Sequence, residues 1–395
     1  MLSEQAVPVV RATLPAVGGA LDEITERFYG RLFAAHPELL RDLFNRGNQA
    51  NGEQRKALAG SIAAFAVALL ENPDSRPDAM LSRIAHKHAS LGVTSEQYKT
   101  VHEHLFAAIV EVLGDAVTPE VAQAWDEVYW LMANALIAVE ARLYQEAGVA
   151  EGEVWRSMEI AERREETADA VSFVLRSADG TPMAPFRPGQ YVSVRVALPD
   201  GARQIRQYSL SAAPGDPQWR ITVKRVDGDP AGEVSSWLHA HAAAGDTVEV
   251  SAPFGDLVLP EGESPLLLAS AGIGSTPMLS MLNHLAATGS TRPVVVVHAD
   301  RTPASHAHAD ELRRLVDALP QGTLHLWYEE PGDSDARPGL ADVTLVELPA
   351  GTTAYLCGPL PFLRAVRGDL IGRGTAAADI HYEVFGPDLW LGTEG

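Results

Sequence analysis

The spacing of apolar residues predicts helices in the first part of the chain. Up to about residue 148, apolar side chains recur every three or four positions, which gives a helix one apolar face. In the stretch 94–113 these positions are Tyr98, Val101, Leu105, Ala108 and Val112. A similar segment runs from about residue 54 to 70, and Thr118-Pro119-Glu120 supplies the N-cap, first-turn proline and acid that begin another helix. We therefore expect an all-α domain over residues 1–148.

The hydrophobic period changes to two between about residues 154 and 260. Val192, Val194 and Val196 alternate with Ser193 and Arg195. Turn signals such as Asp179-Gly180, Asp200-Gly201 and Gly228-Asp229-Pro230 separate the alternating runs. This pattern predicts a small antiparallel β-barrel over residues 153–260.

Short, continuous apolar runs alternate with helical stretches in the rest of the chain. Buried parallel strands joined by crossover helices have this pattern. The runs are Leu266–Ala269, Val294–His298, Leu324–Tyr328 and Ala354–Cys357. We expect an α/β domain with a parallel sheet over residues 264–395, so the predicted fold is multidomain: all-α, antiparallel barrel, then α/β.

Composition and charge narrow the classes of function. Lysine and arginine total 31 against 52 acidic residues, a net charge of −21, which is the wrong sign for binding nucleic-acid phosphates or anionic lipid. The apolar run Ile62–Leu70 is well short of the ~18 residues that span a bilayer. The N-terminus lacks the pattern of a secretory signal. A single cysteine, Cys357, excludes an internal disulfide, a thiolate zinc site and an iron–sulfur cluster. We expect a cytoplasmic monomer with no nucleic-acid partner and no integral membrane association.

A motif in the barrel region fits a flavin diphosphate. The run Arg206-Gln207-Tyr208-Ser209 ends a predicted strand, and the tyrosine could stack on an isoalloxazine while the serine bonds its N5 edge. Tyr191 precedes this run, and Gly232-Glu233-Val234-Ser235 follows it at a helix start, where backbone N–H groups can hold an anion. This stretch contains only one acidic residue, Asp216. Its five cations are Arg203, Arg206, Arg220, Lys224 and Arg225. The strands of an acidic barrel can carry arginines without a ligand, but three motifs in this order favour a flavin site.

A glycine-containing turn follows the first strand of the α/β region. The turn and helix start comprise Gly272, Ile273, Gly274, Ser275, Thr276 and Pro277. Glycines let the backbone approach a pyrophosphate closely, and Cys357-Gly358-Pro359 at the end of a later strand would lie near a nicotinamide. With the barrel motifs, residues from about 153 to the end resemble the ferredoxin–NADP reductase family. The resemblance implies that FAD and NAD(P)H are bound.

One histidine of the helical domain is a candidate haem ligand. His88 is expected to share an apolar helix face with Leu81 and Ile84, whereas His86 is expected to lie about 200° away and to face solvent. A histidine in a helical domain is more often a surface or core residue than a ligand, but an imidazole on an inward apolar face needs a partner, and haem iron is one. Lys87 would place a cation nearby.

The helical region resembles the globin of the flavohaemoglobin family, and with the reductase region the likeness extends over the whole chain. The residues that carry it are Phe28, Tyr29, Phe44, Gln54, Leu58, His88, Tyr98 and Glu140, together with the run Asn51-Gly52-Glu53-Gln54-Arg55. The resemblance implies haem b with His88 as the iron ligand, Phe44 wedged against the haem, and Leu58 as a distal wall. It also implies that Tyr29 and Gln54 act on the distal side and that Tyr98 and Glu140 form a proximal relay.

The implied activity is that of a nitric oxide dioxygenase. Electrons pass from NAD(P)H through FAD to haem, and NO is oxidised with O₂ to nitrate, which detoxifies NO. The C-terminal run Glu383-Val384-Phe385-Gly386-Pro387 would contact flavin and nicotinamide, although the family usually has cysteine where Val384 stands. Glu383 and Lys87 could tune the flavin and haem potentials through charge.

Two other classes of function remain open at this point. The chain could be an NAD(P)H-dependent flavin reductase whose helical domain binds a protein partner and no haem, or it could be an O₂ sensor or carrier whose reductase keeps the iron ferrous. The sequence also leaves NADH and NADPH open, because Arg301 would suit a 2′-phosphate while the adjacent Asp300 argues against one.

Overall fold

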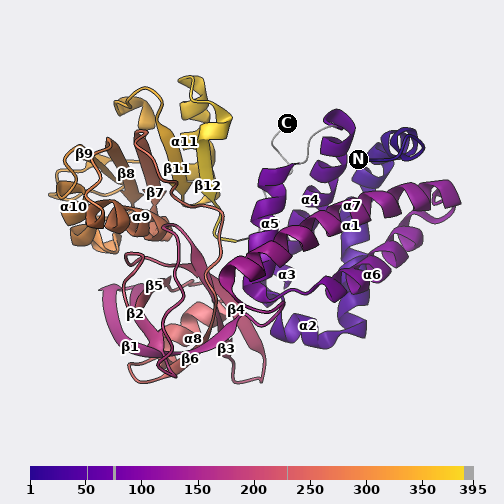
Figure 1. Cartoon of the computed structure of the whole chain (residues 1–395), viewed down its shortest axis with the longest axis horizontal. Coiled ribbons are helices and arrows are strands. Elements are labelled where there is room, and N and C mark those ends of the chain that lie inside the picture. Colours follow the sequence, from indigo (N-terminus) through magenta and orange to yellow (C-terminus); the bar gives the residue numbers. More distant parts are fainter. Residues whose placement is uncertain (51, 74–76, 229, 387–395) are drawn as a thin grey trace. The chain divides into compact units, whose positions relative to one another are not determined.

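The computed structural model describes residues 1–50, 52–73, 77–228 and 230–386 (Figure 1). The chain divides into two compact units. Among the described residues, the first unit holds Met1–Trp155 and Ala197–Ile205, and the second holds Arg156–Val196 and Arg206–Gly386. The predicted β-barrel and α/β regions thus form one unit, except that the barrel segment Ala197–Ile205 belongs by its contacts to the helical unit.

The first unit is helical, as its hydrophobic spacing predicts. Its described helices are α1 (Ala6–Ala35), α2 (Pro37–Asp42), α3 (Arg46–Ala50), α4 (Glu53–Glu71), α5 (Asp78–Leu91), α6 (Ser95–Leu113) and α7 (Pro119–Ala147). Thr94 and Gln97 form a capping box at the start of α6, and the Thr118 side chain accepts a hydrogen bond from the N–H of Val121 at the start of α7. α1 packs against α4, α6 and α7, and α5 packs against α7.

An antiparallel sheet begins the second unit. The strands are β1 (Trp155–Thr167), β2 (Ala170–Ser177), β3 (Tyr191–Ala197), β4 (Arg203–Ser209), β5 (Trp219–Lys224) and β6 (Thr247–Ser251), in the order β4-β3-β6-β1-β2-β5. An antiparallel bridge between Leu210 and Ile221 brings the chain after β4 to β5 at the other edge, as barrel closure requires. Ser193 and Thr222 are buried along with the neighbouring valines, so the alternating pattern does not separate core from solvent here. α8 (Glu233–His241) lies between β5 and β6 in the chain.

A parallel sheet forms the rest of the second unit, as predicted. Its strands are β7 (Leu266–Ala271), β8 (Val294–Asp300), β9 (Gly322–Tyr328), β10 (Arg337–Pro338), β11 (Thr353–Cys357) and β12 (Ile380–Glu383), in the order β10-β9-β8-β7-β11-β12. The helices are α9 (Ser275–Ala287), α10 (Ala309–Asp317) and α11 (Leu360–Gly372). The order reverses between β7 and β11, and ligands of open α/β sheets bind beyond the strand ends at such a point.

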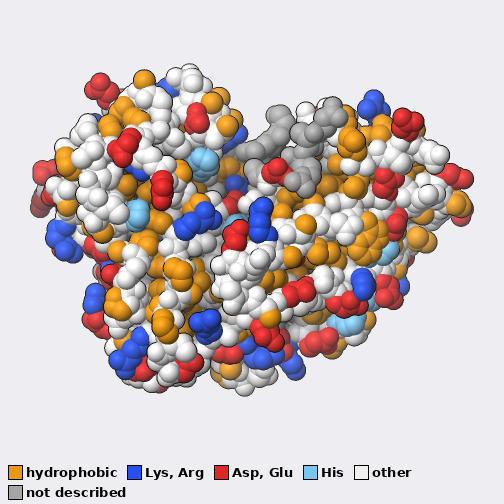
Figure 2. All heavy atoms as spheres, in the orientation of Figure 1, with side chains coloured by type: hydrophobic (Ala, Val, Ile, Leu, Met, Phe, Trp, Pro, Cys, Tyr) orange, Lys and Arg blue, Asp and Glu red, His pale blue; other side chains and the backbone are white. Residues whose placement is uncertain are grey.

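The surface carries both signs of charge. Carboxylates and cations are interspersed over the face drawn in Figure 2, although the whole sequence has a net charge of −21. Within the described part of the chain, no helix combines the length and apolar character needed to cross a membrane.

Candidate functional site

Three helices of the first unit bring His88, Tyr98 and Glu140 together. His88 lies in the last turn of α5, which Gly92 ends in a left-handed conformation (φ +77°). Tyr98 lies in the first turn of α6, and Glu140 is an inward-facing residue of α7. The His88 Nδ1 atom lies 2.9 Å from both the Tyr98 hydroxyl oxygen and Glu140 Oε1, and Tyr98 donates a 2.6 Å hydrogen bond to that same Oε1.

These contacts fix the protonation pattern of the His88 ring. Glu140 is only 2% exposed, and an ionised carboxylate only accepts hydrogen bonds, so the His88 Nδ1–H donates to it. The His88 Nε2 atom is therefore left with its lone pair, as in a metal-binding histidine anchored by a carboxylate. Burial and the neighbouring charge of Glu140 raise the pKa of Tyr98, which stays a donor. These residues fit the proximal side of a haem.

The expected exposure of His86 is wrong. His86 is 6% exposed, and the buried arc of α5 also includes Ala85, Ala89 and Ser90. The buried arc is wider than the apolar spacing predicts. His88 therefore lies at the edge of the arc and not at its centre, and its side chain is half-buried. Lys87, beside His88, is also half-buried.

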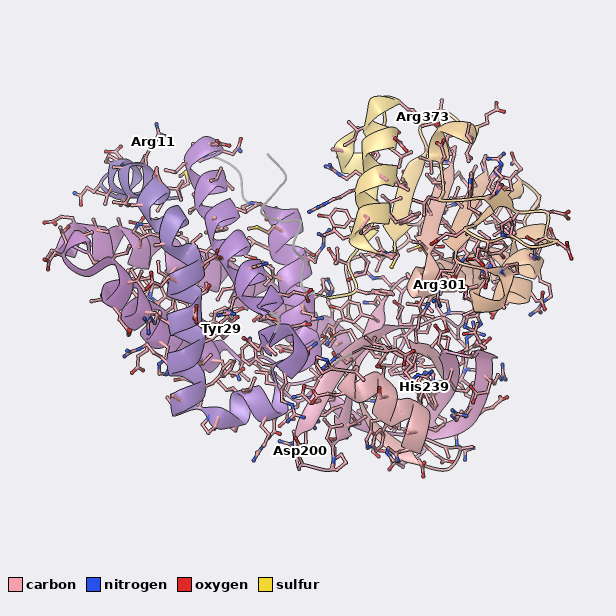
Figure 3. All side chains as sticks on the ribbon, turned by 180° about the vertical axis from the view of Figure 1, so that it is seen from behind. Arg11, Tyr29, Asp200, His239, Arg301 and Arg373 are labelled. Atoms are coloured by element: carbon pink, nitrogen blue, oxygen red, sulfur yellow. The ribbon has the colours of Figure 1, made fainter. Side chains whose placement is uncertain are left out.

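The residues expected on the side of the haem away from His88 lie around a cluster of aromatic rings. The Tyr29 ring, on α1, lies 5.5 Å from that of Phe33 and 5.8 Å from that of Phe44 (centroid distances; Tyr29 is labelled in Figure 3). The rings of Phe33 and Phe44 are 5.3 Å apart in an edge-on arrangement. Phe44 lies in the short connection between α2 and α3, so the aromatic contacts fix where this connection passes α1.

Two glutamine side chains surround the Tyr29 hydroxyl. Burial raises the pKa of Tyr29, and hydrogen bonding by Gln54 and Gln49 partly offsets this, so the phenol remains a proton donor at neutral pH. Gly52, in a left-handed conformation (φ +77°), starts α4 and places Gln54 in its first turn. Leu58 is half-buried one turn further along α4. Asn51, part of the predicted motif, lies outside the described residues.

A solvent-open hollow of about 370 Å³ reaches Tyr29 from the surface. It is lined by Glu26, Tyr29, Gly30, Phe33, Leu40, Arg46, Gln49, Ala50 and Arg55. The Arg55 guanidinium lies 3.5 Å from the Glu26 carboxylate at this hollow. A small molecule can therefore reach the surface beside Tyr29.

The predicted flavin residues lie at the end of β4 and beside it. Tyr191 and Ser209 are buried, and the Gln207 amide donates a 2.9 Å hydrogen bond to the Ser193 hydroxyl on β3. Burial raises the pKa of the Tyr208 phenol, with the Arg206 charge acting in the opposite direction. The Arg206 guanidinium lies 3.9 Å from the carboxylate of Glu233 in the first turn of α8.

The structure brings the Arg206 run together with the start of α8. Val234 and Ser235 are buried in the first turn of that helix, and the Ser235 hydroxyl accepts from the N–H of Val226 at 3.2 Å. A Cβ atom on Gly232 would lie 2.7 Å from the Ser235 hydroxyl oxygen, so the helix start is closely packed. A helix start with a guanidinium beside it fits one phosphate group of a dinucleotide.

The predicted cluster of five cations is wrong. Four of them pair with separate carboxylates: Arg203 with Asp42, Arg220 with Glu311, Lys224 with Asp169 and Arg225 with Asp227. Neighbours in the sequence point in different directions on neighbouring strands and turns, so counting local charge overestimated the positive charge at one place. The guanidinium of the fifth, Arg206, lies 3.9 Å from Glu233 in the first turn of α8.

The two nicotinamide motifs meet at the carboxyl edge of the parallel sheet. Gly272 has φ +54° in the turn after β7. A Cβ atom on Gly274 would lie 2.3 Å from the Cys357 carbonyl oxygen, so only glycine allows this turn to approach the end of β11. Gly358 follows Cys357, and Pro359 precedes α11. Burial and the charge of Glu383 raise the pKa of the Cys357 thiol, which excludes a reactive thiolate.

The start of α9 has a buried polar atom that fits a ligand. Within the described part of the chain, the Ser275 hydroxyl is buried with no hydrogen-bond partner. Thr276 bonds the carbonyl oxygen of Ile273 at 3.0 Å, and Pro277 is buried within the helix start. An orphaned hydroxyl at a helix start suits a phosphate oxygen or a carboxamide.

The C-terminal candidates follow β12, which pairs with β11 so that Glu383 is the partner of Cys357. Val384 is half-buried, and Phe385 is 47% exposed, which leaves an aromatic ring on the surface. Gly386 has φ +146°. Pro387 lies outside the described residues.

The two residues weighed for nucleotide choice are both engaged. The Asp300 side chain accepts 2.7 Å hydrogen bonds from the Arg301 N–H and the Ser305 hydroxyl. The Arg301 guanidinium lies 3.2 Å from the Asp169 carboxylate. Both side chains are therefore held by contacts within the chain.

Phe33 and Gln49 also lie beside Tyr29, and neither was predicted from the sequence. Phe33 is one helical turn from Tyr29, and i, i+4 spacing from a candidate distal residue would have suggested it. Gln49 lies in the five-residue helix α3, which is too short to show a periodic pattern.

Three family descriptions match the chain in order along the sequence. Residues 26–136 match the globin family, residues 157–258 the oxidoreductase FAD-binding domain, and residues 268–368 the oxidoreductase NAD-binding domain. A globin joined to a flavin- and nicotinamide-binding module defines a haem–flavin oxidoreductase.

Relatives along the full length narrow this class. The flavohemoprotein of Rhizobium meliloti (strain 1021) is 44% identical over 405 residues, covering 99% of this chain and all of that protein. The flavohemoprotein of Chromobacterium violaceum is 43% identical over 402 residues, covering 98% of both chains. The crystal structure of a flavohemoglobin from Malassezia yamatoensis with bound FAD and heme matches with a TM-score of 0.90 and 39% identity, over 98% of this chain and all of that one.

The chain belongs to the flavohemoprotein family. It is an oxidoreductase that binds haem, FAD and NAD(P)H, and its globin binds O₂.

Proposed function

We propose that this protein is a nitric oxide dioxygenase in which NAD(P)H supplies electrons through FAD to the haem and NO is oxidised with O₂ to nitrate. The observation that carries the proposal is that one helical unit contains both a buried, protonated Tyr29 phenol and a His88 side chain anchored by a carboxylate. The solved FAD/NAD-binding domain of nitric oxide dioxygenase from Vibrio cholerae is also similar to this chain, with 38% identity, a TM-score of 0.57 and coverage of 60% of this chain and all of that one. We place the domain limits at 1–148, 153–260 and 264–395.

When bound beside Arg206 and the start of α8, FAD would supply the conversion of a two-electron donor into single electrons, and haem held by His88 would supply O₂ binding and one-electron chemistry. Each NO converted to nitrate consumes one electron and one O₂, so one NAD(P)H supports two conversions. What the chain adds is the positioning of the bound groups and the control of protons.

On the distal side, Tyr29 is the hydrogen-bond donor. Its phenol keeps its proton because burial raises its pKa, and Gln54 and Gln49 hold the hydroxyl in place. A fixed O–H can donate a hydrogen bond to a bound small ligand that gains negative charge. Leu58 and Phe44 supply the apolar walls, and a solvent-open hollow lies beside Tyr29.

On the proximal side, Glu140 and Tyr98 orient the imidazole of His88. The 2.9 Å contact between His88 Nδ1 and Glu140 Oε1 increases the basicity of the opposite nitrogen. A more basic ligand donates more electron density to iron and favours activation of O₂. Lys87 adds a cation next to the iron ligand.

In the reductase unit, the motif residues bind and orient the two nucleotides. Arg206 and the start of α8 hold the flavin diphosphate, while Tyr208, Ser209, Tyr191 and Gln207 contact the rest of the flavin. The turn 272–277 would hold the nicotinamide nucleotide's pyrophosphate, and Cys357-Gly358-Pro359 would lie near its nicotinamide ring. Phe385 and its described neighbours Glu383, Val384 and Gly386 would contact the flavin and the nicotinamide. The single buried cysteine agrees with a reducing compartment and supports a cytoplasmic location.

One set of spectra and one NO titration test the proposal. The purified protein is expected to show a haem Soret band and flavin absorbance, and NADH or NADPH under air is expected to reduce both. Repeated additions of NO are then expected to be consumed many times per haem, with matching oxidation of NAD(P)H. A flavin spectrum without a Soret band would indicate a flavin reductase alone, and NO consumption that stops after one equivalent of haem would indicate an oxygen carrier.

A further inference from the structure

The β3–β4 turn of the flavin barrel belongs by its contacts to the helical unit. The turn is tightly closed: the Leu198 N–H bonds the Ala202 carbonyl oxygen at 2.8 Å, and Gly201 has φ +85°. The Ala202 N–H bonds Asp200 Oδ1 at 3.0 Å, which fixes the side chain of Asp200 (labelled in Figure 3). A turn with these internal bonds holds its neighbours in defined positions.

Gln204, in β4, uses its side chain to bond the backbone between α2 and α3. Its Nε2 atom donates to the carbonyl oxygens of Arg41 at 3.0 Å, Phe44 at 3.2 Å and Leu40 at 3.4 Å. Its Oε1 atom accepts from the N–H of Arg46 at 3.3 Å. Gln204 has an exposed fraction of 0%, so no water replaces these bonds at its surface.

These bonds satisfy groups that a short helix leaves without partners. The last carbonyl groups of an α-helix have no N–H partner within the helix, and α2 has only six residues. Leaving such a buried carbonyl without a donor destabilises the local conformation. The side chain of Gln204 therefore acts as a C-terminal cap for α2 from another part of the chain.

Two ion pairs lie beside the amide. The carboxylate of Asp42 accepts from the backbone N–H of Arg203 at 3.1 Å and from its guanidinium at 3.3 Å. Asp200 Oδ2 lies 2.6 Å from the guanidinium of Arg46. Hydrogen bonds from Arg41 and Arg203 lower the pKa of Asp42 to about 2, so this carboxylate is ionised at neutral pH. Because Asp42 ends α2 and Arg46 begins α3, the two ion pairs hold the connection between these helices at both of its ends.

The bonded connection carries Phe44. Its ring packs edge-on against Phe33 and Tyr29, so a displacement of the Phe44 backbone would move the aromatic cluster. Gln49 follows within α3, and its side chain is one of the two that bond the Tyr29 hydroxyl. Gln204 is thus connected to Tyr29 through one residue, Phe44, whose carbonyl oxygen it bonds and whose ring contacts the Tyr29 ring.

We infer that Gln204 is a positioning residue for the haem pocket, which holds Phe44 against the haem by bonding its carbonyl oxygen and the end of α2. The inference rests on the proposed contact of Phe44 with haem, and it goes beyond the redox reaction. A residue of the flavin barrel thereby controls haem retention and the polarity of the distal side.

The full-length holoprotein with Gln204→Met tests this inference, because methionine has similar volume and length but neither donates nor accepts as an amide does. Haem transfer to excess apomyoglobin is expected to be about tenfold faster than in the parent, which corresponds to about 1.4 kcal/mol. The C–O stretching frequency of the carbonmonoxy form is expected to shift, because it reports polarity near Tyr29. FAD content and the rate of flavin reduction by NADH are expected to stay within twofold of the parent.

A matched control comes from the same hairpin. Arg195, on β3, makes two hydrogen bonds of 2.9 and 2.6 Å to Glu249 on the barrel, and Arg195→Gln is expected to leave haem transfer unchanged. A double variant tests whether Gln204 acts through Phe44. If it does, Gln204→Met is expected to change the rate of haem transfer much less in a Phe44→Leu background than in the parent. Equal effects in both backgrounds would overturn the inference.

The inference would also be overturned if Gln204→Met transferred haem at a rate within twofold of the parent and its C–O stretching frequency were unshifted. Should Gln204→Met not fold, the double variant Asp200→Asn, Arg203→Ala disrupts the two flanking surface pairs instead. It is expected to lose haem about threefold faster, and an unchanged rate would contradict the inference. None of these measurements uses NO, so a negative result would contradict this inference without contradicting the dioxygenase proposal.

Discussion

The Nδ1 atom of His88 lies 2.9 Å from Oε1 of Glu140, although 52 residues separate the two in the chain. Tyr98 donates to the same carboxylate oxygen at 2.6 Å, so three helices contribute to one hydrogen-bonded group. Glu140 is 2% exposed, and a buried carboxylate without such donors would be costly. The carboxylate is therefore stabilised by the same bonds that orient the imidazole.

Replacing His88 by alanine is expected to abolish haem retention and leave FAD bound, because the reductase unit does not include this helix. The ratio of Soret to flavin absorbance in the purified variant measures this directly. His86→Ala is the matched control: His86 is buried, so its loss is expected to reduce stability by about 1–3 kcal/mol while haem remains. Haem lost from His86→Ala and kept by His88→Ala would reverse the assignment.

Arg206→Ala and Tyr208→Ala are each expected to weaken FAD binding. The guanidinium beside α8 and the aromatic face of the tyrosine are each worth about 1–3 kcal/mol, which is roughly tenfold to a hundredfold in affinity. Flavin content after extensive dialysis is the measurement, and haem content is expected to stay at the parent level. Arg176→Ala is the control, since Arg176 pairs with Glu159 at 2.6 Å elsewhere on the barrel. Full FAD retention in both site variants would move the flavin site elsewhere.

Gly274→Ala is expected to slow hydride transfer from NAD(P)H to flavin by at least about tenfold. The added methyl group would lie 2.3 Å from the Cys357 carbonyl oxygen, so the nucleotide-binding turn and the end of β11 must separate. An ångström-scale misplacement can cost about a hundredfold in rate. Stopped-flow flavin reduction measures it. Gly368→Ala in α11, where a Cβ would meet no atom within 4 Å, is expected to react at the parent rate.

Tyr29→Phe removes one oxygen atom and is expected to leave folding and haem content intact. Loss of a hydrogen bond to a charged acceptor typically costs about 1.5–3 kcal/mol, so O₂ is expected to leave the reduced protein roughly ten- to a hundredfold faster. Flavin reduction by NAD(P)H serves as the internal control and is expected to be unchanged. An O₂ dissociation rate within twofold of the parent would mean that Tyr29 only packs against Phe33 and Phe44.

The sequence predicted the three fold types because each rests on a local period. Helix starts such as Thr94 and Thr118 carry their own capping groups, and the four apolar runs are the long strands of the parallel sheet. Candidate residues in local motifs, such as those near Gly274, could be found in the same way.

Contacts between distant segments were not predictable in this way. His86 is buried because neighbouring helices cover more of α5 than its apolar stripe indicates. Arg203 pairs with Asp42 rather than joining a local cluster, and Gln204 bonds a connection that lies about 160 residues earlier. Such pairings depend on which surfaces meet after folding, and no spacing within one segment reports that.

The most direct test of the central claim is the origin of the oxygen atoms in the product. The NADH-reduced protein is given NO under dioxygen labelled with heavy oxygen, and the nitrate formed is analysed by mass spectrometry. We predict one nitrate for each NO consumed, with both added oxygen atoms carrying the label. Nitrite as the main product, or nitrate with an unlabelled added atom, would contradict the assignment of this protein as a nitric oxide dioxygenase.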